Sequence, residues 1–263
     1  KREYYYDENG RETLNIYYNW DTQTAAFVPS TKDEYGYDEN GNQTLRSISN
    51  WYEDAQALIE DYRIERAYDE NGRQTLTSIS NWYEDAQALI EDYRIESAYD
   101  ENGRQTLVVN YQFDQNTLIL IPTFRQELTY DENGRQTLYL DYYINLETQS
   151  FIPNIKYEYY YDENGRQTLF LGYIFNQENQ SFIPNYKTEY YYDENGNQTL
   201  FLEYFFNQET QSFIPNYKTE YYYDENGNQT LNLNYYFNQE SQSFISNSKV
   251  ELEYDENGRR RFF

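Results

Sequence analysis

The stretch Tyr6-Asp7-Glu8-Asn9-Gly10 sets the organisation of the whole chain. It returns eight more times, always 31 residues after the previous copy. Such a fixed period is the signature of a repeat array, in which each unit mainly contacts its neighbours. We therefore expect residues 1–263 to form a single tandem-repeat β domain of eight 31-residue repeats plus a partial closing copy. The recurring turn residues are Asp7, Gly10, Asp38, Gly41, Asp69, Gly72, Asp100, Gly103, Asp131, Gly134, Asp162, Gly165, Asp193, Gly196, Asp224, Gly227, Asp255 and Gly258.

Each repeat has the pattern of a long β-hairpin. Residues 212–223 are rich in Phe, Ile and Tyr and precede one copy of the turn, and the equally aromatic residues 228–237 follow it. A polar stretch at 238–243 then leads to the next repeat, as expected for strand, tight turn, strand and longer turn. The pattern predicts an all-β fold in which tandem 31-residue β-hairpin repeats form a long antiparallel meander. Because open sheets of so many strands curl or gain a second layer, we expect a coiled or superhelical β-ribbon, a closed sheet or a sheet paired with another copy.

The residues of the turn favour one hairpin geometry. A type I turn prefers Asp at its first position and Gly at its fourth, as at Asp224 and Gly227, with the Gly in the left-handed region as a bulge. The alternative is a two-residue type I′ turn on Asn226 and Gly227. The bulged register places Tyr221 opposite Leu231 and gathers the apolar residues on one side, so we prefer it. A further bulge or kink is expected at the Pro column, because Pro cannot donate to an interior strand ladder. That column consists of Pro29, Pro122, Pro153, Pro184 and Pro215.

In this register, one face of the sheet is predicted to hold the Leu column that contains Leu231, the Tyr before each Asp and a column of aromatic packing residues. An aromatic row of this kind can stack on sugars, but the alternation along each strand favours a packing face. The predicted packing residues are Trp20, Trp51, Trp82, Phe113, Phe175, Phe206, Phe213 and Phe237.

The opposite face is predicted to carry rows of opposite charge and a column of Ile residues. The basic row consists of Lys1, Lys32, Arg63, Arg94, Arg125, Lys156, Lys187, Lys218 and Lys249, and an acidic row of Glu follows two residues later in every copy, from Glu3 to Glu251. Exposed pairs of this kind contribute little singly, about 0.2–1 kcal/mol each, but a whole row penalises slipped strand pairings.

The composition excludes several functions. The net charge of −26 disfavours binding to nucleic acid and to anionic membrane surfaces. The chain has no Cys and no His, which excludes thiolate or imidazole metal sites and the triads that need these residues. We therefore predict no enzymatic activity and no cofactor, with Ca²⁺ at the acidic turns kept as an alternative, although Asp-Glu-Asn-Gly lacks the full ligand set of an EF-hand. No apolar run is long enough to cross a membrane. The N-glycosylation pattern occurs at Asn42, Asn179, Asn197 and Asn228.

The repeat resembles two kinds of known sequence. Tyr192-Asp193-Glu194-Asn195-Gly196-Asn197 and its counterparts resemble the YD repeats of bacterial Rhs and toxin-complex shell proteins, which are strings of β-hairpins, although those repeats are usually shorter than the 31 residues found here. The complete unit is similar to tyrosine-rich tandem repeats in secreted surface proteins of Bacteroidetes-type bacteria. That resemblance implies an extracellular or cell-surface location and assigns no catalytic residue.

These observations lead to one functional expectation and two alternatives. We expect a structural protein of an extracellular fibre or surface filament, whose partner is itself and which assembles through its aromatic sheet face and its strand edges. The first alternative is an adhesin stalk or carbohydrate-binding surface that uses exposed Tyr and Trp. The second is a segment of a YD-repeat toxin shell.

Overall fold

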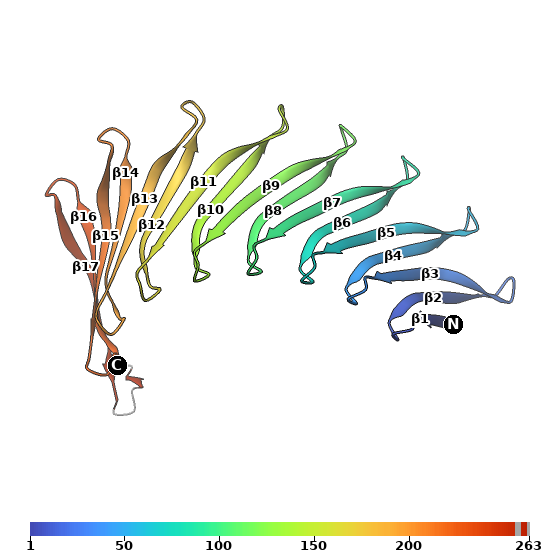
Figure 1. Cartoon of the computed structure of the whole chain (residues 1–263), viewed down its shortest axis with the longest axis horizontal. Helices are drawn as coiled ribbons and strands as arrows, with labels where there is room; N and C mark the ends of the chain where they lie inside the picture. Colours follow the sequence, from blue (N-terminus) through green and yellow to red (C-terminus); the bar gives the residue numbers. More distant parts are fainter. Residues whose placement is uncertain (256–258, 262–263) are drawn as a thin grey trace. The chain divides into compact units, whose positions relative to one another are not determined.

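The computed structural model describes residues 1–255 and 259–261, so the predicted turn residue Gly258 lies outside the described residues. Within each of two compact units, consecutive strands lie side by side in chain order and pair antiparallel (Figure 1). The strands are β1 (Arg2–Tyr6), β2 (Glu12–Asp21), β3 (Ala26–Tyr37), β4 (Gln43–Tyr52), β5 (Ala57–Tyr68), β6 (Gln74–Tyr83), β7 (Ala88–Tyr99), β8 (Gln105–Asp114), β9 (Ile119–Tyr130), β10 (Gln136–Asn145), β11 (Ser150–Tyr161), β12 (Gln167–Asn176), β13 (Ser181–Tyr192), β14 (Gln198–Asn207), β15 (Ser212–Tyr223), β16 (Gln229–Asn238), β17 (Ser243–Glu251), β18 (Glu253–Tyr254) and β19 (Arg260–Arg261).

The predicted all-β fold of tandem hairpins is confirmed. Strands β1 to β17 belong to one open antiparallel sheet of 17 strands, and β18 pairs with β19. None of the described residues forms a helix, and so none forms a helix that could cross a membrane.

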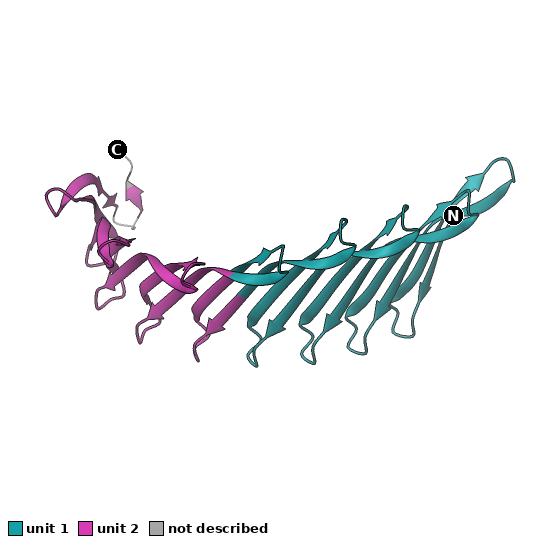
Figure 2. Cartoon of the chain, turned by 90° about the horizontal axis from the view of Figure 1, so that it is seen from above, with its two compact units in different colours: residues 1–126, 142–152 teal, residues 127–141, 153–263 magenta. Residues whose placement is uncertain are grey.

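The chain divides into two compact units (Figure 2). Unit 1 comprises Lys1–Gln126 and Tyr142–Ile152, and unit 2 comprises Glu127–Asp141 and Pro153–Phe263. Within unit 1, β1 to β8 pair in sequence order, and within unit 2 the same holds for β11 to β17.

The predicted register is wrong by one residue beyond the turn. Leu231 lies opposite Tyr222 rather than Tyr221, because Thr230 is an extra residue in β16 that has no partner in β15. The Thr230 hydroxyl donates to the carbonyl oxygen of Tyr222 at 3.2 Å and so occupies the space that the bulge opens. The second bulge, expected at the Pro column, is confirmed at Asn216, which follows Pro215 and lies opposite no residue of β14 in the backbone register.

Because of the two bulges, several residue columns lie on a different face of the sheet from the one predicted. Lys218 lies opposite Tyr235, and Glu220 lies opposite Leu233, so the charged rows share one face with the Leu columns and the aromatic packing residues. We call this side the ion-pair face. The expectation that these groups lie on opposite faces is therefore wrong, as is the expectation that the Tyr before each Asp lies with Leu231. That Tyr and the Ile column form the other side, which we call the isoleucine face.

Within each unit the described strands form a single layer (Figure 2), and their side chains are mainly half-buried. Among the described residues, Val109 and Leu128 are the buried hydrophobic side chains, and no large side chain is fully buried. The other buried residues are polar: Asn15, Ser47, Ser49, Ser78, Ser80, Thr188 and Thr219.

Candidate functional site at the turn edge and on the two faces

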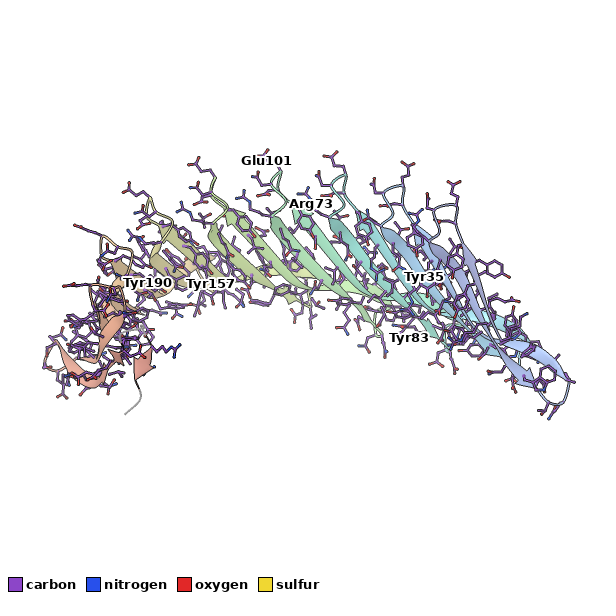
Figure 3. The ribbon with its side chains drawn as sticks, turned by 90° about the horizontal axis from the view of Figure 1, so that it is seen from below. Tyr35, Arg73, Tyr83, Glu101, Tyr157 and Tyr190 are labelled. Carbon is purple, nitrogen blue, oxygen red and sulfur yellow. The ribbon has the colours of Figure 1, made fainter. Side chains whose placement is uncertain are left out.

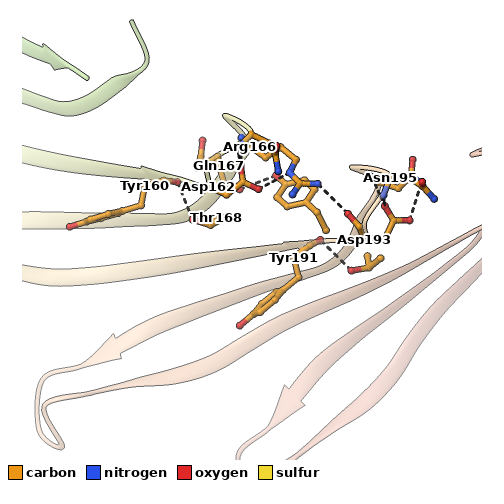
Figure 4. A network of polar contacts seen from close by, with 12 residues as sticks. Tyr160, Asp162, Arg166, Gln167, Thr168, Tyr191, Asp193 and Asn195 are labelled. Carbon is orange, nitrogen blue, oxygen red and sulfur yellow. Dashed lines mark hydrogen bonds and ion pairs between the residues drawn. The ribbon is translucent and has the colours of Figure 1, made fainter. Parts of the chain in front are cut away.

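The turn built on Asp193 shows how the recurring stretch folds (Figure 4). The Gly196 N–H donates to the Asp193 carbonyl oxygen at 3.1 Å, and Gly196 has a φ of 89°, which few residues other than glycine adopt. The Asp193 Oδ1 accepts the backbone N–H groups of Asn195 at 3.0 Å and Asn197 at 2.8 Å. The hydrogen bond from the Asn197 side chain is the main cause that lowers the pKa of Asp193, and desolvation opposes it. The carboxylate therefore organises its own turn.

The structure places the other described turn residues in the same way. Gly10, Gly41, Gly72, Gly103, Gly134, Gly165, Gly196 and Gly227 have φ values of 76–89°, and each N–H donates to the carbonyl oxygen of the Asp three residues earlier at 2.9–3.1 Å.

The residue that follows the turn Gly connects neighbouring hairpins where it is Arg. The Arg166 Nε pairs with Asp162 Oδ2 of its own turn at 2.6 Å, and its Nη1 donates to the Asp193 carbonyl oxygen of the next turn at 3.2 Å. Its guanidinium also lies 5.0 Å from the centre of the Tyr192 ring. Arg11, Arg73 and Arg135 make the equivalent contacts with the next hairpin (Figure 3 labels Arg73). Asn197, by contrast, donates to its own Asp193 Oδ2 at 2.9 Å.

The Tyr that precedes each turn Asp makes a second connection between hairpins. The Tyr192 hydroxyl donates to the Gln167 carbonyl oxygen of the previous hairpin at 2.9 Å. Equivalent bonds to a Gln carbonyl oxygen, at 2.8–3.0 Å, are made by Tyr68, Tyr99, Tyr161, Tyr223 and Tyr254, and Tyr37 donates to the Glu12 carbonyl oxygen at 2.9 Å. The Tyr, the Asp and the Gly of the recurring stretch are thus all used to build and join hairpins.

The acidic turns offer few ligands for a cation. In the Asp193 turn, Oδ1 and Oδ2 of the Asp both accept hydrogen bonds from the turn itself. Glu101 lies at the tip of its turn (Figure 3). Within residues 1–255 and 259–261, no group of three or more carboxylate side chains is arranged to hold a metal ion.

On the ion-pair face of unit 2, three Glu residues of the acidic row, Glu158, Glu189 and Glu220, each receive three hydrogen bonds. Glu189 accepts from Lys187 Nζ at 2.8 Å, from the Tyr204 hydroxyl at 2.9 Å and from the Tyr191 hydroxyl at 3.2 Å. Lys187 Nζ also lies 4.0 Å from the centre of the Tyr204 ring. Partial burial raises the pKa of Glu189, but the hydrogen bonds from Lys187 and Tyr204 outweigh it and hold that pKa below its ordinary value. The same arrangement recurs around Glu158 and Glu220.

Unit 1 uses other partners on the same face. Arg63 pairs with Glu60 through Nε at 2.8 Å and Nη2 at 2.7 Å, across the bulge that separates them. The Ser47 hydroxyl donates to Glu60 at 2.6 Å. At the start of the chain, the Tyr18 hydroxyl donates to Glu3 at 2.7 Å, and this hydrogen bond raises the pKa of Tyr18 to about 12.

The predicted packing residues lie near the long turns, mostly in cross-strand pairs. Ring centroids are 5.0–5.3 Å apart in the pairs Trp20–Phe27, Phe175–Phe182, Phe206–Phe213 and Phe237–Phe244. Trp51 lies opposite Leu58, Trp82 lies opposite Leu89, and the Phe113 ring is 5.6 Å from that of Tyr83.

The isoleucine face of unit 2 holds an aromatic cluster around Phe170. From the sequence we expected Phe170 to lie with the Ile column, but not its contacts with Tyr157 and Tyr186. The Phe170 ring lies 5.3 Å from Tyr157 and 5.4 Å from Tyr186 (Figure 3 labels Tyr157). Gly172 makes room for this cluster, because a Cβ at this position would lie 2.4 Å from a ring carbon of Tyr186. The sequence feature that could have indicated the cluster is Gly172 itself, because the equivalent position in other repeats holds a larger residue such as Ile79.

Comparisons with known proteins identify no family. No family model matches the chain, and neither does any curated protein. A protein of unknown function from Bacteroides fragilis NCTC 9343 is 21% identical with a TM-score of 0.41, over 49% of this chain and 91% of that one. A DUF3836 family protein from Bacteroides vulgatus ATCC 8482 is 16% identical with a TM-score of 0.30, over 35% of this chain and 90% of that one. A chain of the TcdB2-TccC3-Cdc42 structure is 13% identical with a TM-score of 0.32, over 98% of this chain and 16% of that one.

Proposed function

We propose that the protein is a structural component of an extracellular fibre or surface filament and that it self-assembles through its sheet. The observation that carries the proposal is that the described strands of each unit form a single layer. Two hydrophobic side chains are buried among the described residues, whereas sixteen large ones are exposed. Exposed apolar area of this extent on a regular sheet is typical of a surface that another molecule covers.

The contacts between hairpins suit such a role. Within each unit, neighbouring hairpins are joined by the backbone ladder, by the Tyr hydroxyl bond to a backbone carbonyl and, at some turns, by the Arg bridge. Because these contacts repeat with the sequence, added repeats lengthen the sheet without requiring new contacts. In this proposal the repeat is a longer variant of the YD hairpin, in which Tyr and Asp have the structural roles described above.

The proposal makes the chain a non-enzymatic protein. On the ion-pair face of unit 2, Glu158, Glu189 and Glu220 accept hydrogen bonds from Lys and Tyr in a regular row. Acid–base catalysis needs two groups whose surroundings separate their pKa values in a cleft, and a uniform row provides no such asymmetry. The extracellular location in the proposal follows from the resemblance to secreted tyrosine-rich repeats.

Electron microscopy of the purified chain tests the assembly directly. We expect long assemblies of uniform width, and we expect added salt to favour them because it screens the repulsion between chains of net charge −26. Fields of isolated particles of single-chain size, at high protein concentration and at every salt concentration, would contradict the proposal.

One observation favours glycan binding as a second candidate function. Tyr160, Tyr191 and Tyr222 occupy the same position on successive hairpins of the ion-pair face, and each is 46–47% exposed. Each hydroxyl donates to the Glu two residues earlier, so each ring lies along its strand. Binding on a glycan array that is lost when Tyr191 is replaced by Ala would support this candidate, and an array without signal would remove it.

A further inference from the structure

The isoleucine face of unit 2 is almost free of charge. Among the described strand residues from Ile155 to Val250, Glu203 is the one charged side chain on this face, and it accepts a hydrogen bond from Asn216. Asp141 accepts the equivalent bond from Asn154, and Arg166 contacts the Tyr192 ring at the turn edge. The ion-pair face of the same strands carries a Lys and a Glu in every repeat. In unit 1, the isoleucine face also bears charged residues such as Asp33 and Arg46. Because the chain has a net charge of −26, a second copy meets less repulsion at this face of unit 2, which carries few charged side chains.

The same face exposes a row of apolar side chains. Ile174 is 50% exposed, Phe205 is 55% exposed and Tyr236 is 45% exposed, at equivalent positions in three successive hairpins. The register places them opposite Ile183, Ile214 and Ile245 in the neighbouring strands. Together these six residues form an apolar strip that crosses β12 to β17. A strip of this kind without charge at its centre has the composition of an interface core.

The size of the face matches a standard interface. Seven strands, β11 to β17, at about 4.8 Å each give a width of roughly 34 Å, and about seven residues of each strand at about 3.3 Å give roughly 23 Å. The product is close to the roughly 800 Å² per partner that a stable protein interface buries. The face is therefore large enough for a sheet-on-sheet contact, in which the two layers lie about 10 Å apart.

We propose that the isoleucine face of unit 2 docks onto the same face of a second copy of this chain. The proposal rests on the proposed function and names the surface through which assembly begins. The contact is isologous, so each apolar strip packs on its own counterpart around a twofold axis. The ion-pair faces point outward from this pair and keep their charged rows in solvent.

Sedimentation velocity of the full chain and two matched variants tests the surface. Phe205→Lys places a charge in the apolar strip, whereas Tyr191→Lys makes the same change in charge at a residue of similar exposure, 47%, on the ion-pair face of the same unit. We expect the wild type and Tyr191→Lys to dimerise alike. We expect Phe205→Lys to dimerise at least about tenfold more weakly, because each dimer buries two added Lys side chains in place of two apolar rings. Far-UV circular dichroism verifies that both variants are folded.

A labelling experiment covers the case in which Phe205→Lys does not fold. The chain has no Cys, so Tyr236→Cys and Tyr222→Cys each introduce a single thiol, at positions of similar exposure on the two faces. We expect maleimide to react more slowly with the Cys at position 236 as protein concentration rises, and at an unchanged rate with the Cys at position 222.

The outcomes separate the inference from the proposed function. If the wild type assembles but Phe205→Lys and Tyr191→Lys assemble equally well, or protection appears at position 222 instead of 236, this surface is wrong and the proposed function stands. If the wild type stays monomeric at high concentration, both are wrong.

Discussion

Replacing Arg166 by Asn tests whether the hairpins are coupled at the turn edge. The substitution is matched within the chain, because Asn197 occupies the equivalent position in the next repeat and still bonds its own Asp193 carboxylate. Arg166→Asn should therefore keep the bond to Asp162 and lose the two contacts with the following hairpin. Arg166→Ala loses all three.

The expected loss of stability in Arg166→Asn follows from the two lost contacts. The bond from Arg166 Nη1 to the Asp193 carbonyl oxygen is 3.2 Å long, and a bond of this kind contributes about 0.5–1.5 kcal/mol. The guanidinium lies 5.0 Å from the Tyr192 ring centre, a contact of about 0.5–1 kcal/mol at an exposed site. Since the Arg166 side chain is 27% exposed, we take the lower part of the combined range, about 1–1.5 kcal/mol for Arg166→Asn.

Native-state hydrogen exchange at Gly196 is the local assay, because its N–H donates to Asp193 in the turn that Arg166 contacts. Arg166→Asn should accelerate this exchange about five- to tenfold, and urea unfolding should show the matching loss of stability. The reverse substitution, Asn197→Arg, should slow exchange in the turn at Gly227. If Arg166→Asn and Arg166→Ala both leave the exchange at Gly196 unchanged, Arg166 does not couple the two hairpins.

Further substitutions and pH test the packing, the turn and the row of ion pairs. Gly172→Ala should destabilise unit 2 by about 1–3 kcal/mol in urea unfolding, because the Tyr186 ring must move, and an unchanged midpoint would contradict the contact. Gly196→Ala should cost about 1–2 kcal/mol through its φ of 89°, and Gly196→Asn, which tolerates this φ, should cost less. The Lys218 hydrogen bond lowers the pKa of Glu220, so its contribution to stability is present above the unfolded value of about 4.3 and is lost as pH falls through the lowered pKa in acid titrations. Burial raises the pKa of Tyr204, so its contribution is fully present below about pH 10 and is lost at higher pH, where tyrosinate absorbance and unfolding should rise together.

The hairpin repeat could be predicted because the residues of the turn themselves specify the turn type. Asp at the first position and Gly at the fourth specify the type I turn, and the period of 31 residues carries this conclusion through the chain. The bulge at Asn216 was also foreseeable from Pro215, which cannot donate to the ladder. Repeats without Pro have the same bulge, for example at Asp61. Pro is therefore compatible with the bulge and marks its position, but it is not the cause of the bulge.

The faces could not be predicted because one missed bulge changes the side of every residue on a strand. The signal was present, since Thr occupies the bulge position in every complete repeat, from Thr13 to Thr230. Its hydroxyl donates to a backbone carbonyl across the strand, as in Thr199 to Tyr191 at 3.3 Å (Figure 4 shows the equivalent Thr168). Thr between Gln and Leu is also a common residue of regular strands, so the sequence pattern alone does not distinguish a Thr at a bulge from a Thr in a regular strand. The contacts of Tyr157 and Tyr186 with Phe170 depend on this corrected register and were not predicted for the same reason.

The thermal midpoint of unfolding, measured over an approximately hundredfold range of protein concentration, tests the central claim most directly. If the one-layer sheet gains its second layer by self-assembly, the native form is stabilised by mass action, and the midpoint should rise steadily with concentration. A midpoint that stays the same across the whole range would show that the sheet is complete as a single chain and would contradict the account.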